Sequence, residues 1–500
     1  MENNFISFLD SPDGEKYFGR IRTLHFLDKR CDELCHNLPL ETKIPNLKVI
    51  SHFSGWEFID KNNLNWLTST EYDDNNICNE LKRYPLPENL AKNLKKFLQN
   101  RVPGPLVIRG ILNSEDMGLP AAYKMFQPRF IMDPPANLQT RFSVISSAIK
   151  NIWAQSLSKL SKAFFRILTL PHKDQMATIM ISEPELPHRG SFYYPDLSVV
   201  LWAENKNSFH GLCSGGIWDP AHGKFPDPVE FIPGEAIKVG PGTLLAFDPK
   251  KDKLISISWH LAKTHGTKNL PVITEDMAEK HKTKKKKQYL ATSDSNLSRY
   301  TKIICQRLWD QLQTPFRLLF CLQPEMNKGK NTIYINSIRT FTPPFTKTPF
   351  AFPEIVNIKQ FFNSKEVLGT GSGIIRYLIH LKSDSLLARK QLKHLLQYLH
   401  CKGYGALLAV KDIKALNNSS MAKLLKHPAI TVIYSENSPS DSWTGDIPVI
   451  VSPLNKLNLS SSKLLKINDY ENKNEFTIHT APNPILVTID QKAGRGMGWF

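Results

Sequence analysis

Pro187 to Lys268 runs PHRGSFYYPDLSVVLWAENKNSFHGLCSGGIWDPAHGKFPDPVEFIPGEAIKVGPGTLLAFDPKKDKLISISWHLAKTHGTK, and this stretch decides the expected fold. It contains four short apolar runs, which are Leu197–Ala203, Val229–Ile232, Thr243–Phe247 and Leu254–Trp259. Each run has the length of a strand and β-branched or aromatic residues, with Gly, Pro or Asp near its ends. No segment between them has the spacing of an amphipathic helix. The pattern predicts a central antiparallel β jelly roll, also called a double-stranded β-helix.

Two histidines border these runs. His188 stands just before the first run, and His260 closes the last one. In a jelly roll such positions can lie side by side at the mouth of the barrel. Two imidazoles with one carboxylate on one face suit Fe(II), which needs open positions for an oxidant and a substrate. Lys268, or Lys263 in its place, follows the second histidine and is suited to hold the carboxylate of a 2-oxo acid.

The order of these features resembles the Fe(II)/2-oxoglutarate-dependent dioxygenases. The matching features, in sequence order, are His188, the strand-like Val199–Trp202, Gly215–Gly216, Gly242–Phe247, His260 and Lys268. The resemblance covers only this central stretch. It implies an oxidoreductase, a hydroxylase or a halogenase-like enzyme, with Fe(II) and 2-oxoglutarate as cofactors and an unknown substrate. It implies His188 and His260 as iron ligands and Lys268 or Lys263 as the 2-oxo acid partner.

One position departs from the family pattern. The family opens with His-x-Asp, whereas this chain has Gly190 after His188 and Arg189. In the halogenase branch a small residue stands there and a halide ligates the iron. Alternatively, Asp196 or Asp219 supplies the carboxylate from a neighbouring turn, or the chain is a degenerate jelly roll without a metal.

A second pair of metal ligands is available before the central stretch. His172 and Asp174 form a literal His-x-Asp within Pro171–Asp174. This pair supplies the carboxylate that Gly190 lacks, so it is the alternative opening motif for an iron site.

Four regions follow from the composition along the chain, and together they predict an α+β multidomain protein. Residues 1–100 form a mixed N-terminal region, and residues 101–275 hold the jelly roll with a supporting helix over Arg141–Leu168. Residues 276–355 form a basic and Pro-rich linker region with a helix, and residues 356–500 form a C-terminal α/β domain.

The C-terminal domain alternates strands and helices. Strands are expected at Ile374–Leu381, Gly405–Val410, Ala429–Ser435 and Ile447–Ser452, with helices between them. The stretch Gly369–Gly373 (GTGSG) follows a strand-like run, and a glycine-rich strand-to-helix turn lets the backbone approach a phosphate or an adenosyl group. A nucleotide- or adenosyl-dependent transferase is therefore one alternative function.

The formal net charge of +18 favours polyanionic partners. A non-enzymatic, basic nucleic-acid-binding or structural interaction protein is thus the other alternative to the oxygenase. Lys284–Lys287 lies in a charge run that could serve as a nuclear-import signal. The chain has no apolar run long enough to cross a membrane and no signal-peptide pattern at its start, so we expect a cytoplasmic protein, or a nuclear one if that signal is used.

Seven cysteines in 500 residues do not suggest a disulfide framework. Cys31, Cys35 and His36 cluster in one short segment. Their spacing leaves two interpretations, a zinc site or two buried thiols on one helix face.

Overall fold

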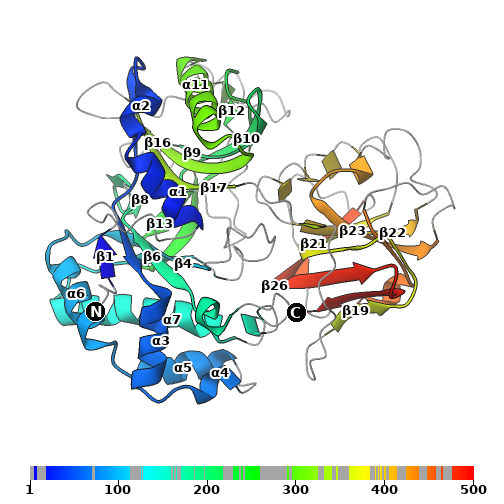
Figure 1. Ribbon diagram of the computed structural model, residues 1–500. Coiled ribbons are helices and arrows are strands. Elements are labelled where there is room, and N and C mark those ends of the chain that lie inside the picture. The colour runs from blue at the N-terminus through cyan, green and yellow to red at the C-terminus, as the bar shows by residue number, and fades with distance from the viewer. Residues whose placement is uncertain are drawn as a thin grey trace. The chain divides into compact units, whose positions relative to one another are not determined.

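A computed structural model describes most of the chain. The described residues are 5–7, 19–69, 74–112, 126, 128–158, 161–162, 165, 171–184, 186–195, 197–217, 229–235, 238–239, 243–258, 290–291, 295–324, 331–340, 345–346, 360–382, 389, 392–393, 395–396, 399–400, 405–413, 424–438, 447–457, 463–464 and 476–499. They form a mixed α+β structure with several sheets, most of them antiparallel (Figure 1).

The chain divides into two compact units. The first unit consists of Met1–Met117, Phe126–Lys159 and Pro171–Phe341, and the second consists of Gly118–Met125, Leu160–Leu170 and Thr342–Phe500. We describe each unit by itself. The expected boundary in the charge run before Gln288 lies outside the described residues.

The α-helices whose ends are defined within the described residues all belong to the first unit. They are α1 Gly19–Asp28, α2 Cys31–Cys35, α3 His52–Lys61, α4 Trp66–Ser69, α5 Asp74–Arg83, α6 Glu88–Gln99, α7 Leu138–Ser156 and α11 Ser295–Leu312, with the 3-10 helix η4 His172–Gln175. None of the helices in the described residues is long and apolar enough to span a bilayer.

One sheet of the first unit has five antiparallel strands. In spatial order they are β1 Phe5–Ser7, β3 Leu47–Ile50, β6 Thr178–Ser182, β4 Pro105–Ile111 and β5 Arg129–Met132. Helix α7 packs on β4, and its Ile145, Ile149 and Trp153 are fully buried, as their three- and four-residue spacing predicts. The helix begins at Leu138, where the side chain of Asn137 accepts a hydrogen bond of 2.9 Å from the Thr140 amide. It ends at Ser156, well before the expected Leu168.

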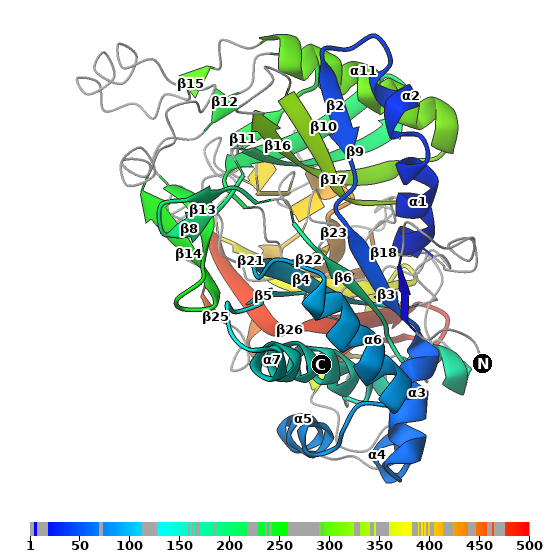
Figure 2. The same ribbon diagram turned by 90° about the vertical axis from the view of Figure 1, so that its left-hand side faces the viewer.

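A second sheet of the first unit has six strands. In spatial order they are β11 Val229–Phe231, β10 Ser208–Gly215, β9 Leu197–Asn205, β16 Phe316–Pro324, β17 Asn331–Thr340 and β2 Leu40–Lys43. Only the β17–β2 pair among these is parallel. Helices α1 and α2 lie beside β17 and β2 (Figure 2), and Leu24, Leu27 and Leu308 share the apolar core of this sheet.

A smaller sheet of the first unit has four antiparallel strands. In spatial order they are β14 Lys253–Ser258, β13 Thr243–Asp248, β8 Phe192–Tyr193 and β7 His188–Arg189; a separate two-stranded sheet pairs β12 Lys238–Val239 with β15 Leu290–Ala291. The four-stranded sheet meets the six-stranded sheet at a bridge between Gly216 and Leu245, where the amide of Ile217 donates to the Leu245 carbonyl at 2.7 Å.

All four strands expected in the central stretch are confirmed, but they do not share one sheet. β9 and β11 belong to the six-stranded sheet, and β13 and β14 belong to the four-stranded sheet. The second neighbour of β9 is β16, more than a hundred residues further along the chain. Within the described residues no closed barrel or jelly roll is present, because strand propensity is local whereas pairing depends on distant segments.

The second unit is built on a ten-stranded mixed sheet. In spatial order its main path is β19 Gln360–Ser364, β27 Arg495–Trp499, β26 Phe476–Asp490, β21 Gly371–Leu381, β22 Gly405–Asp412, β23 Ile430–Asn437, β24 Val449–Val451 and β20 Val367–Leu368; β18 Phe345–Thr346 pairs with β21 and β25 Lys463–Leu464 pairs with β26. Strands β21 to β24 are parallel and adjacent in chain order. The short 3-10 helix η6 Leu454–Lys456 follows β24. The strand predictions for this domain are confirmed.

The glycine-rich stretch of this unit is not a strand-to-helix turn, so that prediction was wrong. Gly371 and Gly373 lie inside β21, paired with β26, and the hydroxyls of Ser372 and Thr488 are 2.8 Å apart. Only Gly369 is in a turn, with φ 82°, before the strand begins. Most of the glycine-rich stretch that suggested a transferase is therefore strand backbone inside the sheet.

Candidate functional site

His188, the first expected iron ligand, lies on the hairpin formed by β7 and β8. Its side chain is exposed, and its ring centroid lies 4.6 Å from that of Tyr193. The next residue, Arg189, is buried, and its guanidinium lies 5.4 Å from the centre of the Tyr194 ring. Ring contacts to neighbouring aromatic residues thus account for the placement of both side chains.

Gly190, which stands where the oxygenase family has Asp, occupies the turn of this hairpin. Its φ is 63°, in the left-handed region that glycine adopts without strain. A turn requirement therefore explains the glycine without a halide ligand.

His260, Lys263 and Lys268 lie outside the described residues, as do Asp196 and Asp219. The register of the four-stranded sheet shows where the chain leads before His260. His188 pairs with Tyr193, Tyr193 with Phe247, and Phe247 with Leu254.

Leu254 is therefore the β14 residue level with His188 across the sheet, and β14 continues from it to Ser258. Four residues at about 3.3 Å each carry it roughly 13 Å along the strand, and three strand spacings of about 4.8 Å separate β14 from β7. The described part of β14 leads away from His188, so a shared metal requires the chain to turn back after Ser258. The His188–His260 metal site stays a prediction.

His172 and Asp174, the alternative ligand pair, lie in the 3-10 helix η4. His172 is exposed and stacks on Trp56 of α3, with ring centroids 4.1 Å apart. The Asp174 amide donates to the Pro171 carbonyl at 2.9 Å. A search of the described residues finds no group of three or more His, Cys, Asp or Glu side chains that could hold a metal ion.

Cys31 and Cys35 lie on one short helix, α2, next to Thr42. The Thr42 hydroxyl donates to the Cys31 carbonyl at 2.8 Å and lies 3.2 Å from the Cys35 sulfur. Burial, assisted by the charge of Asp28, raises the pKa of Cys31 to about 12. Both thiols are half-buried, and among the described residues no group of three possible metal ligands includes them, which favours the interpretation as two thiols on one helix face.

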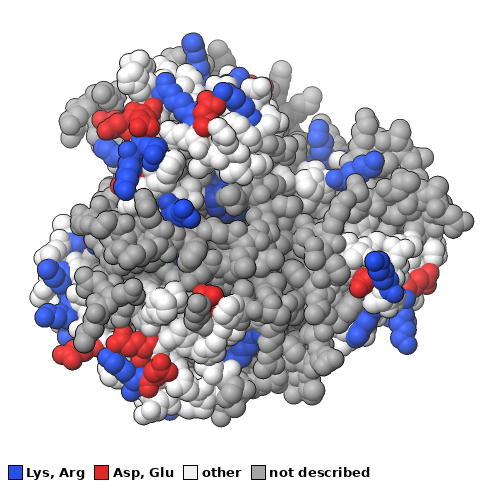
Figure 3. Space-filling view, viewed as in Figure 1, with Lys and Arg blue, Asp and Glu red and all other residues white. Residues whose placement is uncertain are grey.

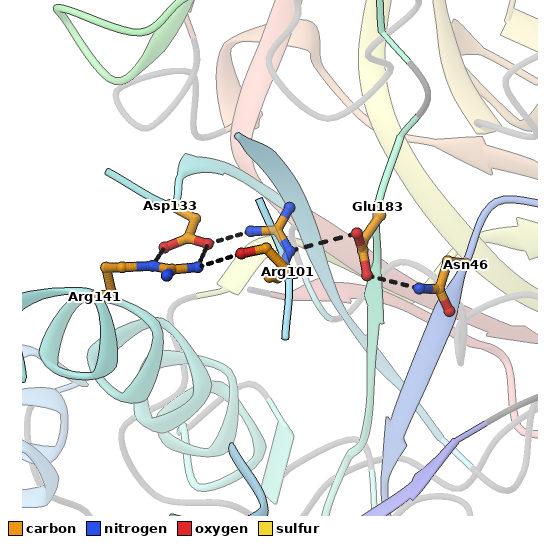
Figure 4. Close-up of polar contacts among 5 residues, drawn as sticks. All are labelled: Asn46, Arg101, Asp133, Arg141 and Glu183. Atoms are coloured by element: carbon orange, nitrogen blue, oxygen red, sulfur yellow. Dashed lines mark hydrogen bonds and ion pairs between the residues drawn. The ribbon is translucent and has the colours of Figure 1, made fainter. Parts of the chain in front are cut away.

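A buried network of charges is the most highly organised polar feature of the first unit (Figure 4). Asp133 is fully buried and accepts two hydrogen bonds from Arg141, both of 2.8 Å, and a further one from Arg101. Arg101 also pairs with Glu183 at 3.4 Å, and Glu183 accepts from the Asn46 side-chain amide at 2.8 Å.

This network joins five segments that are distant in sequence. Arg101 follows α6, Asp133 follows β5, Arg141 is in α7, Glu183 follows β6, and Asn46 precedes β3. The hydrogen bonds to Asp133 raise the pKa of Arg141. Two guanidinium groups balance two carboxylates. We therefore assign the network a structural role, which is to hold α6 and α7 against the five-stranded sheet.

A different polar cluster lies in the second unit, at the carboxyl ends of parallel strands. His380 in β21 is paired with Ala409 in β22, which is paired with Tyr434 in β23, so these side chains share one face of the sheet. Lys411 of β22 and Glu436 of β23 stand two residues beyond Ala409 and Tyr434, on the same face. Lys382 directly follows the end of β21, and its charge acts on His380. Both lysines are exposed, whereas His380 and Glu436 are half-buried.

Neighbouring elements complete this carboxyl-edge cluster. His479 of β26 is paired with Leu378 of β21 and so also lies on the face of His380. Glu436 accepts a hydrogen bond of 3.2 Å from the Leu454 amide, and the Tyr434 hydroxyl donates to the Pro453 carbonyl at 3.2 Å. The segment around η6 therefore borders the cluster on the side of β23.

The electrostatics of the cluster favour neutral histidines. Burial lowers the pKa of His380, and the positive charge of Lys382 and the nearby His479 lower it further, against the opposite effect of Glu436. Burial also lowers the pKa of His479. The cluster therefore combines two permanent positive charges with two imidazoles that ionise only in more acidic solution.

Sequence reasoning found these strands but not the cluster. The available signal was a charged residue placed directly at the end of each buried run, Lys382, Lys411 and Glu436, because the carboxyl ends of adjacent parallel strands meet at one edge. Comparison of the chain with protein-family models and with curated proteins finds no match to either.

Proposed function

We propose that this protein binds a small anionic ligand with a phosphate-type group at the carboxyl edge of the parallel strands in its second unit. The observation that carries the proposal is that His380 of β21 and Lys411 of β22 lie on one face of the sheet, with Lys382 directly after the end of β21. Ligands of open sheets with parallel strands bind outside the carboxyl ends of those strands.

The chemistry of the cluster suits an oxyanion. Two ammonium groups supply positive charge and several hydrogen-bond donors, and the imidazoles supply further donors. Glu436 opposes this charge only in part, because it supplies one negative charge against the two lysines. The proposal keeps the binding part of the transferase alternative but assigns no group transfer.

Titration calorimetry with inorganic pyrophosphate tests the proposal. We expect the double variant Lys382→Gln/Lys411→Gln to bind about tenfold more weakly or worse. The matched control is Lys393→Gln/Lys426→Gln, which makes the same charge change at exposed lysines away from the cluster. Equal binding by both double variants, or none by the unmodified protein, would contradict the proposal.

A broader polyanion or nucleic-acid partner is also consistent with the net charge of +18. Figure 3 shows Lys and Arg interspersed with Asp and Glu on the described part of one face. A small-ligand site and a backbone-binding surface differ in salt dependence, because each phosphate contact on a nucleic acid releases counterions. A steep fall in binding to a random oligonucleotide with rising salt would favour the nucleic-acid function.

The iron oxygenase is a second candidate, favoured by one observation. His188 and the strand that leads towards His260 belong to the same antiparallel sheet. The finer fold that this function needs is a jelly roll in which that sheet closes against the six-stranded sheet, and the Gly216–Leu245 bridge is the described link between them.

Anaerobic titration with Fe(II) and 2-oxoglutarate tests the second candidate. A visible charge-transfer band that is lost in both His188→Ala and His260→Ala would support it. A band lost in His172→Ala instead would point to the alternative pair, and absence of a band in the unmodified protein would end the iron hypothesis.

A further inference from the structure

We infer that the ligand of the carboxyl-edge cluster is a dianion, and that its binding takes up protons at His380 and His479, so that affinity rises as the solution becomes more acidic. This inference rests on the proposed function and adds to it the ligand charge and the mode of regulation.

The placement of the two histidines supports the inference. His380 is paired with Thr477, and His479 is paired with Leu378, so the histidines are diagonal neighbours across the β21–β26 ladder. Diagonal side chains on one face of an antiparallel pair are within reach of each other. One oxyanion can therefore contact both imidazoles.

The charged groups that face the histidines come from four elements. β21 contributes Lys382, β22 contributes Lys411, and β23 contributes Glu436 together with the hydroxyl of Tyr434. Among the described residues, β26 contributes His479 and no carboxylate on this face. Among the residues that the structure describes on this face, positive charge thus exceeds negative charge before either imidazole is protonated.

This excess of positive charge determines whether ligand binding takes up or releases protons. Without a ligand, burial opposes the charging of both histidines, and the charge of Lys382 further opposes the charging of His380. A bound dianion offsets the lysine charges and offers oxygen acceptors to both rings. Its presence therefore favours the protonated imidazoles, and by linkage protonation favours the dianion.

Sulfate is the probe of choice, because it remains a dianion over the range in which histidine titrates, whereas phosphate itself titrates there. We expect sulfate to bind the unmodified full-length protein about tenfold more tightly at about pH 5.5 than at about pH 7.5. The variant His380→Gln/His479→Gln should lose this pH dependence while keeping its affinity at the higher pH.

The outcomes separate the two proposals. Binding of sulfate that does not change with pH, or a pH dependence that survives in the double glutamine variant, would overturn the inference and leave the proposed function standing. Failure of both sulfate and pyrophosphate to bind at any pH would overturn the proposed function itself. His400→Gln/His427→Gln serves as the matched control, because it removes two histidines of the same unit that pack against each other, and His427 precedes the amino end of β23, at the other end of that strand from Glu436.

Discussion

At the residue scale, the charges buried around Asp133 in the first unit compensate one another. Asp133 is held by two guanidinium groups, and both arginine side chains are less than a tenth exposed. Desolvation of ions costs more than most hydrogen bonds return, so each member of such a group depends on the others. Removing one partner leaves a buried charge that nothing balances.

Asp133→Asn should therefore lower the free energy of unfolding by about 3–5 kcal/mol, as when one partner of a buried ion pair is removed. Urea unfolding followed by circular dichroism measures the change. The control is Asp310→Asn, which breaks an ion pair with Lys206 in which both side chains are about half exposed, and should cost less than about 1 kcal/mol. Similar losses in the two variants would contradict the structural role of the network.

At the element scale, two connections are prominent. Arg307 of α11 donates to the Leu34 and His36 carbonyls at 2.8 and 2.9 Å, and so fastens the C-terminal end of α2 to a helix far along the chain. Gly216, between β10 and the bridge to β13, has φ 74° and accepts a 2.6 Å hydrogen bond from Ser198. The first connection satisfies helix-end carbonyls, and the second joins two sheets.

Arg307→Met should lower the free energy of unfolding by about 1–3 kcal/mol, because it keeps much of the aliphatic stem but leaves carbonyls at the end of α2 without their charged donor. Arg83→Met is the control, since the Arg83 side chain is 73% exposed and pairs only with Glu80 of its own helix. Thermal unfolding at matched protein concentrations gives the free energy of unfolding of both variants. A larger loss of stability for Arg83→Met than for Arg307→Met would refute the stabilising role of Arg307.

Gly216→Ala should lower the free energy of unfolding by about 2 kcal/mol or more, because an added methyl group would overlap the Leu245 carbonyl at a left-handed φ. Gly104→Ala provides the contrast, because no atom lies within 4 Å of the added carbon there. Equal denaturant midpoints for the two variants would contradict the close contact between Gly216 and the Leu245 carbonyl.

At the scale of the whole molecule, the response to pH follows from the second unit. His380 and His479 have native pKa values below 6.5, the ordinary value, so the unfolded chain binds more protons than the native protein in the window just below 6.5. Stability therefore rises with pH through that window and falls on acidification. Sulfate should oppose this loss if it binds the protonated histidines.

The measurement is the melting temperature as a function of pH for the unmodified protein and for His380→Gln/His479→Gln. The double variant should show a shallower decline below about pH 6.5. A decline of unchanged steepness would show that other groups dominate the acid response of the molecule.

Prediction from the sequence succeeded where the signal was local. The strands at Leu197–Ala203, Thr243–Phe247 and Ile374–Leu381 are all present, because β-branched and aromatic runs bounded by turn residues specify extended backbone by themselves. Prediction was wrong at the turn expected over Gly369–Gly373, and the described residues show no jelly roll, since both depended on which strands become neighbours.

The sequence by itself determined most strand positions, the α+β class and the excess of positive charge. Only the tertiary structure decided that β9 lies beside β16, and that His380, Lys411 and His479 share one face with Lys382 at the end of β21. The physical reason is that a strand's alternation specifies which side chains point to the same face but not which partner strand lies alongside. That choice depends on apolar surface buried between segments far apart in the chain.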